Sequence, residues 1–370
     1  MKKLFLTTAL LGMALLSFAA EPVFPVKGIC MNTPAPAHTE SFCAFIENDL
    51  APLGVNTLVL RVDYNYEFES YPEMASEKAL SKAETKKIVA ACKKHQIRLI
   101  PLVDLLGHQS WAGKLNRLLE VFPEFDETPY IPLPKDEKTA KRKPNGLFDG
   151  DLYCKSYCPL HPDVHKVVFT LLGEIIDAYE TDALHAGMDE VFYLGEYGCP
   201  RCSGKDKAEL FADEVNKIDS YVRSKDCELW IWGDRLLDGD VTGMGMWEAA
   251  TNGTAAAIDR VNKDVVICDW HYERPVLSAV YFAQKGFKVA TCPWRKPEVA
   301  LQQLDNTLLF RQCATPAMKE RFIGIVHTDW GSAEEFIKEL DRVKKGQPSQ
   351  ENTASNTFYR LFRQIKEKEK

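Results

Sequence analysis

The sequence predicts a (β/α)8 barrel, an α/β fold in which eight parallel strands alternate with helices. Eight short apolar segments recur along the chain, and most are separated by segments of helical periodicity. Polar and aromatic residues follow these apolar segments, as expected where the carboxyl ends of barrel strands open into one mouth. Since the sequence contains no clear linker or internal repeat, we expect residues 21–370 to form one domain with long loops after the strands.

The predicted strands are short and rich in branched aliphatic residues, a pattern typical of parallel strands buried on both faces. They cover residues 26–31, 55–62, 97–103, 184–187, 229–233, 265–270, 287–292 and 322–328. Apolar residues at helical spacing predict helices over residues 39–50, 82–94, 163–179 and 206–223. The glycine-rich stretch between the fifth and sixth strands shows only a weak helix near residues 254–261. A proline-rich and charged stretch, residues 123–151, predicts a long functional surface loop.

The first twenty residues predict a secretory signal peptide. Two lysines follow Met1, residues 4–16 are almost wholly apolar, and small residues at Ser17, Ala19 and Ala20 provide a cleavage site. The apolar run is too short to span a bilayer, and no other segment looks transmembrane. We therefore expect residues 1–20 to be removed on export to the periplasm or the medium. The net charge of −7 argues against a nucleic-acid partner.

Two adjacent carboxylates, Asp189 and Glu190, follow the fourth predicted strand directly. One carboxyl group held neutral can protonate a leaving oxygen while its charged neighbour stabilises positive charge, and proximity itself separates the two pKa values. Glycoside cleavage uses this division of labour. An Asp-Glu dipeptide is also common on protein surfaces, so the surroundings of the pair decide between the two interpretations.

Aromatic residues surround the predicted mouth. Sugars have flat apolar faces ringed by hydroxyl groups, so their binding sites combine aromatic side chains with polar groups. Tryptophans fall just after five predicted strands, and we expect at least two to stack on a sugar while others cap the barrel: Trp111, Trp232, Trp270, Trp294 and Trp330. The placement favours a carbohydrate ligand.

At these positions the chain resembles glycoside hydrolase family 20, the β-N-acetylhexosaminidases. Residues 185–190, His-Ala-Gly-Met-Asp-Glu, resemble the family signature His-x-Gly-x-Asp-Glu. Residues 104–108, Asp-Leu-Leu-Gly-His, are similar to the family's Asp-x-Pro-Gly-His, with leucine in place of proline. Trp232 and Trp330 stand where the family places tryptophans that line the sugar pocket. The resemblance covers roughly residues 26–335.

The resemblance implies an exo-acting enzyme that removes terminal N-acetylglucosamine or N-acetylgalactosamine by a retaining, substrate-assisted mechanism that needs no cofactor. Asp189 would orient the 2-acetamido group, and Glu190 would act as general acid and then base. Tyr272 is the candidate for a hydrogen bond to the acetamido oxygen. His185 and Asp104 would orient Glu190, although a core position is an equal alternative for His185.

The remaining candidates for substrate binding are Arg61 and His108, together with Trp232, Trp270, Trp294 and Trp330. An ion pair with Asp63 is an equal alternative for Arg61. The chain lacks the arginine that the family places after its first strand, and it has Gly331 and Ser332 where the family often has a glutamate. A glycosidase for a modified or disaccharide amino sugar, and a catalytically silent carbohydrate-binding barrel, therefore stay open as alternatives.

The chain contains eleven cysteines, of which two close pairs lie beside the fourth predicted strand and its preceding helix. Four thiolates can complete a tetrahedral zinc site, and Cys-Pro-x-Cys followed closely by glycine is typical of a zinc knuckle. An exported protein favours disulfides equally. We expect either a structural zinc site or two disulfides from Cys154, Cys158, Cys199 and Cys202, with free thiols as the remaining alternative.

Overall fold

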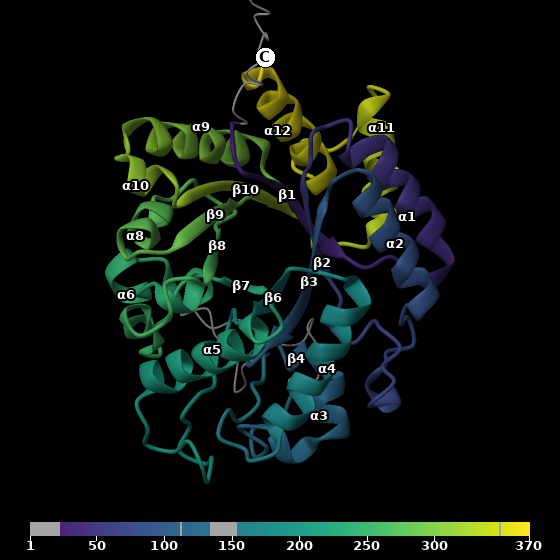
Figure 1. Cartoon of the computed structure of the whole chain (residues 1–370). Coiled ribbons are helices and arrows are strands. Elements are labelled where there is room, and N and C mark those ends of the chain that lie inside the picture. The colour runs from purple at the N-terminus through teal and green to yellow at the C-terminus, as the bar shows by residue number, and fades with distance from the viewer. Residues whose placement is uncertain (1–22, 112, 134–153, 348) are drawn as a thin grey trace, which may run out of the picture.

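The computed structural model describes residues 23–111, 113–133, 154–347 and 349–370, and it confirms the predicted barrel (Figure 1). Eight parallel strands close in the order β1-β10-β9-β8-β7-β6-β3-β2. The predicted strands are all present, with bounds within two residues of those expected: β1 (Val26–Asn32), β2 (Thr57–Arg61), β3 (Arg98–Leu105), β6 (Ala183–Gly187), β7 (Glu228–Trp232), β8 (Val266–Trp270), β9 (Lys288–Cys292) and β10 (Phe322–Thr328).

Helices surround the barrel (Figure 1). The larger ones are α1 (Thr39–Phe45), α2 (Lys82–Lys94), α4 (Val164–Tyr179), α5 (Lys207–Arg223), α8 (Ser278–Gln284), α9 (Pro297–Cys313), α11 (Ala333–Lys344) and α12 (Ala354–Lys368). The helix predicted over residues 39–50 is divided, because α1 passes into a π-helical turn, η2 (Ile46–Leu50). At α2, Ser81 and Glu84 form a reciprocal capping box, which explains why the helix starts where the sequence predicts.

The segment between β7 and β8 lacks a long helix, as its glycine content predicts. It contains the short helices α6 (Gly239–Thr242) and α7 (Gly245–Glu248) and the 3-10 helix η6 (Thr254–Asp259). The segment after β3 is also irregular, with β4 (Ser110–Trp111), β5 (Lys114–Leu115), α3 (Arg117–Val121) and η4 (Pro123–Phe125). These irregular segments follow the carboxyl ends of strands, so they border the mouth.

Two layers of apolar side chains hold the barrel together. One fills the space between strands and helices, and a smaller one fills the barrel interior, where it includes Ile100, Leu102 and Trp230. Alternate residues of each strand point to opposite faces, which explains why continuous apolar runs supply both layers. The interior is therefore a packed core, and the mouth above it is the place for a site.

The predicted signal peptide and residues 134–151 of the predicted long loop lie outside the described residues. Among the described helices, none combines the length and the apolarity that crossing a membrane requires.

Strands β3 and β6 approach each other closely at Gly187. Its φ is +64°, and a Cβ atom on it would lie 2.5 Å from Oδ1 and 2.9 Å from Cα of Asp104. A side chain at residue 187 would therefore face both an unfavourable backbone conformation and a collision with the backbone of β3.

We expect Gly187→Ala to lower the free energy of unfolding by about 2–4 kcal/mol, because the strands must move apart. Gly346→Ala is the matched control: its φ is +65°, but no atom lies within 4 Å of the added Cβ. Gly346→Ala should lower the free energy of unfolding by only about 1 kcal/mol. Urea unfolding of both variants measures the difference, and equal losses would show that the close approach is not the constraint.

Candidate active site

The chain bends sharply after β6 and turns its carboxylates toward the mouth. Met188 has a φ of 72° and Glu190 a φ of 48°, both in the left-handed region that residues other than glycine rarely adopt. Such strained backbone tends to concentrate at functional sites. Asp189 and Glu190 leave the strand in this bend, and each side chain is largely buried.

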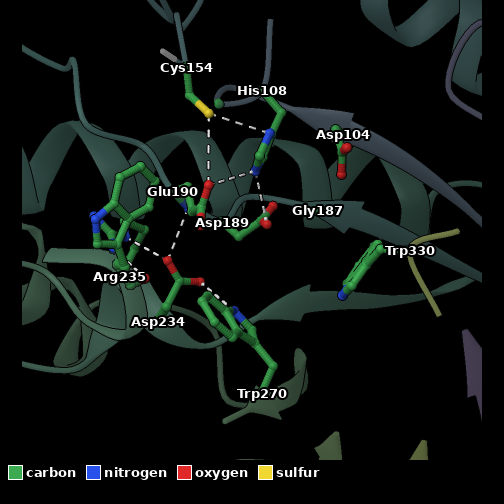
Figure 2. Close-up of polar contacts among 12 residues, drawn as sticks. Asp104, His108, Cys154, Gly187, Asp189, Glu190, Asp234, Arg235, Trp270 and Trp330 are labelled. Carbon is green, nitrogen blue, oxygen red and sulfur yellow. Dashed lines mark hydrogen bonds and ion pairs between the residues drawn. The ribbon is translucent and has the colours of Figure 1, made fainter. Parts of the chain in front are cut away.

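His108, from the loop after β3, lies against both carboxylates (Figure 2). Its Nε2 is 3.1 Å from Oδ2 of Asp189 and 3.4 Å from Oε2 of Glu190. Its Nδ1 is 3.5 Å from the sulfur of Cys154, which in turn lies 3.8 Å from Oε2 of Glu190. One imidazole therefore joins the two acids, and we had expected His108 only as a substrate-binding residue.

The charges in this group follow from burial and proximity. Burial raises the pKa of Asp189, but the neighbouring His108 outweighs it and holds that pKa below its ordinary value. Burial lowers the pKa of His108, whereas its contacts with Cys154 and Asp189 raise it well above the ordinary value. Burial also raises the pKa of the Cys154 thiol to about 12. The pKa of Asp189 is thus lowered and that of His108 raised, which makes the two side chains an ion pair.

Asp234, at the end of β7, fixes the backbone of Glu190. Its Oδ2 accepts a hydrogen bond from the Glu190 N–H at 3.0 Å, and its Oδ1 accepts one from Nε1 of Trp270 at 3.3 Å (Figure 2). Arg235 donates from Nε to Oδ2 of Asp234 at 2.7 Å. We had assigned no role to Asp234 or Arg235, although a polar pair directly after a barrel strand is the signal that marks such residues.

Arg61, at the end of β2, forms two ion pairs. Its Nη2 is 2.6 Å from Oδ2 of Asp104, and its Nε is 2.8 Å from Oδ2 of Asp63. The ion pair with Asp63 that we considered for Arg61 is therefore present. The guanidinium carbon also lies 6.0 Å from the centre of the Trp330 ring, which places Arg61 beside the aromatic side of the mouth.

Asp104 and His185, which we expected to orient Glu190, each have another partner in the structure. Asp104 pairs with Arg61, and burial raises its pKa to about 6 against the effect of that arginine. His185 is fully buried in the strand, where its Nδ1 accepts a hydrogen bond from the Gly187 N–H and its ring packs 4.4 Å from that of Trp232. His185 thus takes the core position that we described as its alternative, and His108 is the histidine that reaches the acids.

The predicted aromatic residues gather around Tyr272. Its hydroxyl accepts a hydrogen bond from Nε1 of Trp330 at 3.0 Å, and its ring centre lies 5.1 Å from that of Trp270 and 5.3 Å from that of Trp294. Trp232 packs against Trp330 at 5.7 Å but is only 2% exposed, so it lies beneath the others. The other three tryptophans are half-buried and can offer a face to a ligand.

Trp111 lies at the rim of the group of acids. It is 53% exposed and stacks on His108, with ring centres 5.9 Å apart.

Burial raises the pKa of Tyr272 well above its ordinary value, so its hydroxyl keeps its proton. The mouth thus combines carboxylates on one side with aromatic rings and a neutral hydroxyl on the other.

The structure corrects the predicted set of four cysteines. Cys158, Cys199 and Cys202 lie together, but the fourth member of their group is Glu127, and Cys154 belongs to the acid site. The chain from Cys154 to Cys158 is anchored by Lys155, whose N–H bonds Oγ of Ser110, and by the N–H groups of residues 157 and 158. The sulfur of Cys154 instead lies against Nδ1 of His108.

Comparison with known proteins agrees with this geometry. The model of the glycosyl hydrolase family 20 catalytic domain matches residues 59–343. Lacto-N-biosidase of Bifidobacterium bifidum is 23% identical over 238 residues, which are 60% of this chain and 17% of that protein. Hexosaminidase D of Bos taurus is 22% identical over 311 residues, which are 80% of this chain and 82% of that protein.

The fold is similar to that of a solved structure. The chitobiase of Flavobacterium johnsoniae superimposes with a TM-score of 0.60 at 16% identity, covering 94% of this chain and 52% of the chitobiase. The chain thus spans about half of that chitobiase and less than a fifth of the lacto-N-biosidase. Because the family model matches most of the chain, the resemblance drawn from residues 104–108 and 185–190 is confirmed, and the protein belongs to glycosyl hydrolase family 20 as a glycoside hydrolase.

Proposed function

We propose that the protein is an exo-acting β-N-acetylhexosaminidase that removes terminal N-acetylglucosamine or N-acetylgalactosamine from glycans by a retaining, substrate-assisted mechanism. The observation that carries the proposal is the adjacent pair Asp189 and Glu190, held by one imidazole at 3.1 and 3.4 Å and faced by the aromatic group around Tyr272. The match to a bovine hexosaminidase over most of both chains supports the same substrate class.

The first half of the reaction breaks the glycosidic bond. The acetamido oxygen of the substrate attacks the anomeric carbon, and Glu190 gives its proton to the departing oxygen, which leaves an oxazolinium ion. Asp189 orients the acetamido N–H and stabilises the positive charge that develops there. Its lowered pKa supports this role, because only the ionised carboxylate can accept that hydrogen bond and carry the opposing charge.

The second half opens the oxazolinium ion. Glu190, now a carboxylate, takes a proton from water, and the oxygen of that water attacks the anomeric carbon on the face that the leaving group vacated. The acetamido group is restored, and the sugar keeps its β configuration. The hydrogen bond from the Glu190 N–H to Asp234 supports this sequence, because Glu190 must face the same oxygen position in both halves.

The sugar itself is bound by the aromatic side of the mouth. Trp270, Trp294 and Trp330 offer rings to its apolar faces, and Tyr272 donates to the acetamido oxygen. We assign the recognition of sugar hydroxyls to Arg61, whose side chain is 27% exposed. The family arginine and glutamate that this chain lacks would otherwise fill that role.

A second candidate is the release of a disaccharide, which the match to a lacto-N-biosidase favours.

We further propose that residues 1–20 direct the protein out of the cytoplasm and are then removed. Mass spectrometry of the protein recovered from an export-competent bacterial host tests this: a mature chain beginning near residue 21 is expected, and an intact Met1 would contradict it.

A panel of nitrophenyl glycosides tests the proposed specificity. We expect hydrolysis of β-N-acetylglucosaminide or β-N-acetylgalactosaminide and no detectable hydrolysis of β-glucoside, because only the N-acetyl sugars carry the internal nucleophile. A β-linked disaccharide, the nitrophenyl lacto-N-bioside, is the fourth substrate. Cleavage of the disaccharide alone would establish the disaccharide alternative. Binding of these sugars without cleavage of any of them would establish a silent carbohydrate-binding barrel.

Two substitutions test the roles of the acids. Glu190→Gln should lower kcat/KM by about 10²–10⁴-fold for a poor leaving group and far less for dinitrophenolate, which needs no proton. Asp189→Asn should lower kcat/KM by about 10²–10³-fold with both leaving groups, because the amide cannot stabilise the oxazolinium ion. Glu367→Gln, an exposed acid on α12, serves as the control. If Glu190→Gln lowered kcat/KM equally for both leaving groups, Glu190 would not be the proton donor.

The pH dependence tests the charge of Asp189. His108→Gln removes the cation that offsets burial, so the pKa of Asp189 should rise. Since the reaction needs ionised Asp189, the acid limb of kcat/KM should move to higher pH by about one unit. His95→Gln, in the turn after α2, is the control and should leave the limb in place. An unmoved acid limb in His108→Gln would mean that His108 does not maintain the charge of Asp189.

A further inference from the structure

We propose that Glu127, Cys158, Cys199 and Cys202 bind one structural zinc ion. Each of these buried residues offers one donor atom, and the four donor atoms all lie within 4.8 Å of one another. The sulfur of Cys158 is 3.1 Å from that of Cys202 and 3.6 Å from that of Cys199. Zinc–sulfur bonds of about 2.3 Å in a tetrahedral site place sulfurs about 3.8 Å apart, so a small expansion of the group accommodates the ion.

Glu127 provides the independent evidence for a cation. Its side chain is 0% exposed, and its Oε1 accepts a hydrogen bond from the Glu196 N–H at 3.1 Å. Its Oε2 is buried and has no nitrogen or oxygen partner, only the sulfurs of Cys199 and Cys202 beside it. Among the described residues no lysine, arginine or histidine pairs with the Glu127 carboxylate. A buried carboxylate oxygen beside three sulfurs is unfavourable unless a positive charge compensates it. A metal ion at the centre of the group supplies that charge.

Disulfide bonds do not satisfy the same four residues. Three sulfurs allow one disulfide, which would leave a third buried thiol and a buried Glu127 carboxylate without a cation. The local backbone favours a metal knuckle instead, because the N–H of Ser203 bonds the Cys199 carbonyl at 3.1 Å and the N–H of Lys205 bonds the Cys202 carbonyl at 3.0 Å. These turns bring both sulfurs of the Cys-Pro-Arg-Cys segment to the same side of the loop.

The ion would be structural rather than catalytic. Three thiolates and one carboxylate complete four-coordinate zinc, which leaves no position for water or substrate. The ligands come from three irregular segments: the one after η4, the one before α4 and the loop between β6 and α5. The second of these also carries Cys154, which contacts His108 at the acid site. The ion would therefore fix loops that border the mouth.

Metal analysis of the full mature chain tests the proposal. We expect one zinc per chain, measured by mass spectrometry after purification without metal-affinity resin. Cys158→Ser and Glu127→Gln should each lose most of it. Two cysteine substitutions are controls that should keep it: Cys313→Ser, at an exposed residue, and Cys154→Ser, from the set predicted by sequence alone. Loss of zinc in Cys154→Ser, or full retention in Glu127→Gln, would overturn the assigned ligands.

X-ray absorption of the wild-type protein keeps the test decisive if a variant fails to fold. The zinc edge should report three sulfurs at about 2.3 Å and one oxygen at about 2.0 Å. A mercurial reagent that reacts with the thiolates should release the zinc ion as it modifies the three cysteine ligands. The proposal fails if protein purified under reducing conditions neither contains zinc nor takes it up stoichiometrically, or if peptide mapping of the native protein finds Cys158 wholly in a disulfide.

Discussion

The geometry of the acid site depends on the close packing of β3 against β6 at their carboxyl ends. Gly187 allows Asp104 to approach, and on the other side a Cβ on Gly107 would lie 2.5 Å from the carbonyl oxygen of Asp189. The segment after β3 therefore rests directly on the backbone of Asp189, and His108 follows at once with its Nε2 against the Asp189 carboxylate. The two glycines in the family motifs thus have one physical explanation.

This packing brings three acidic side chains into a buried region, and each has a cation beside it. Asp189 has His108, Asp104 has Arg61 and Asp234 has Arg235. Burial raises the pKa of all three carboxyl groups, and the cations lower it. Only for Asp189 does the cation prevail, which leaves that carboxylate as the most firmly ionised of the three. That is the charge state that the proposed substrate-assisted mechanism requires.

The sequence predicts the barrel well because continuous apolar runs and helical periodicity are local signals. It also identifies Asp189 and Glu190, since strand ends converge on the mouth in this fold. The choice between His108 and His185 is not local: His185 lies within a strand and points into the core, whereas His108 follows a strand and turns out to the acids. Glu127 carries no signal at all, because one acid in a charged loop becomes notable only when folding buries it.

Polar contacts, more than helices, hold the loops of the mouth. The segment between β7 and β8 has the weakest helical character, yet its carbonyl groups at Met246 and Ala249 accept hydrogen bonds from Nη2 of Arg235 at 2.6 and 2.5 Å. Arg235 in turn holds Asp234, which holds the backbone of Glu190. A glycine-rich segment can bend so that several of its carbonyl groups point at one guanidinium group. In a long regular helix most of these carbonyl groups would instead accept hydrogen bonds within the helix. The irregular path of this segment therefore fixes Arg235, and through Asp234 the backbone of Glu190, the proposed proton donor.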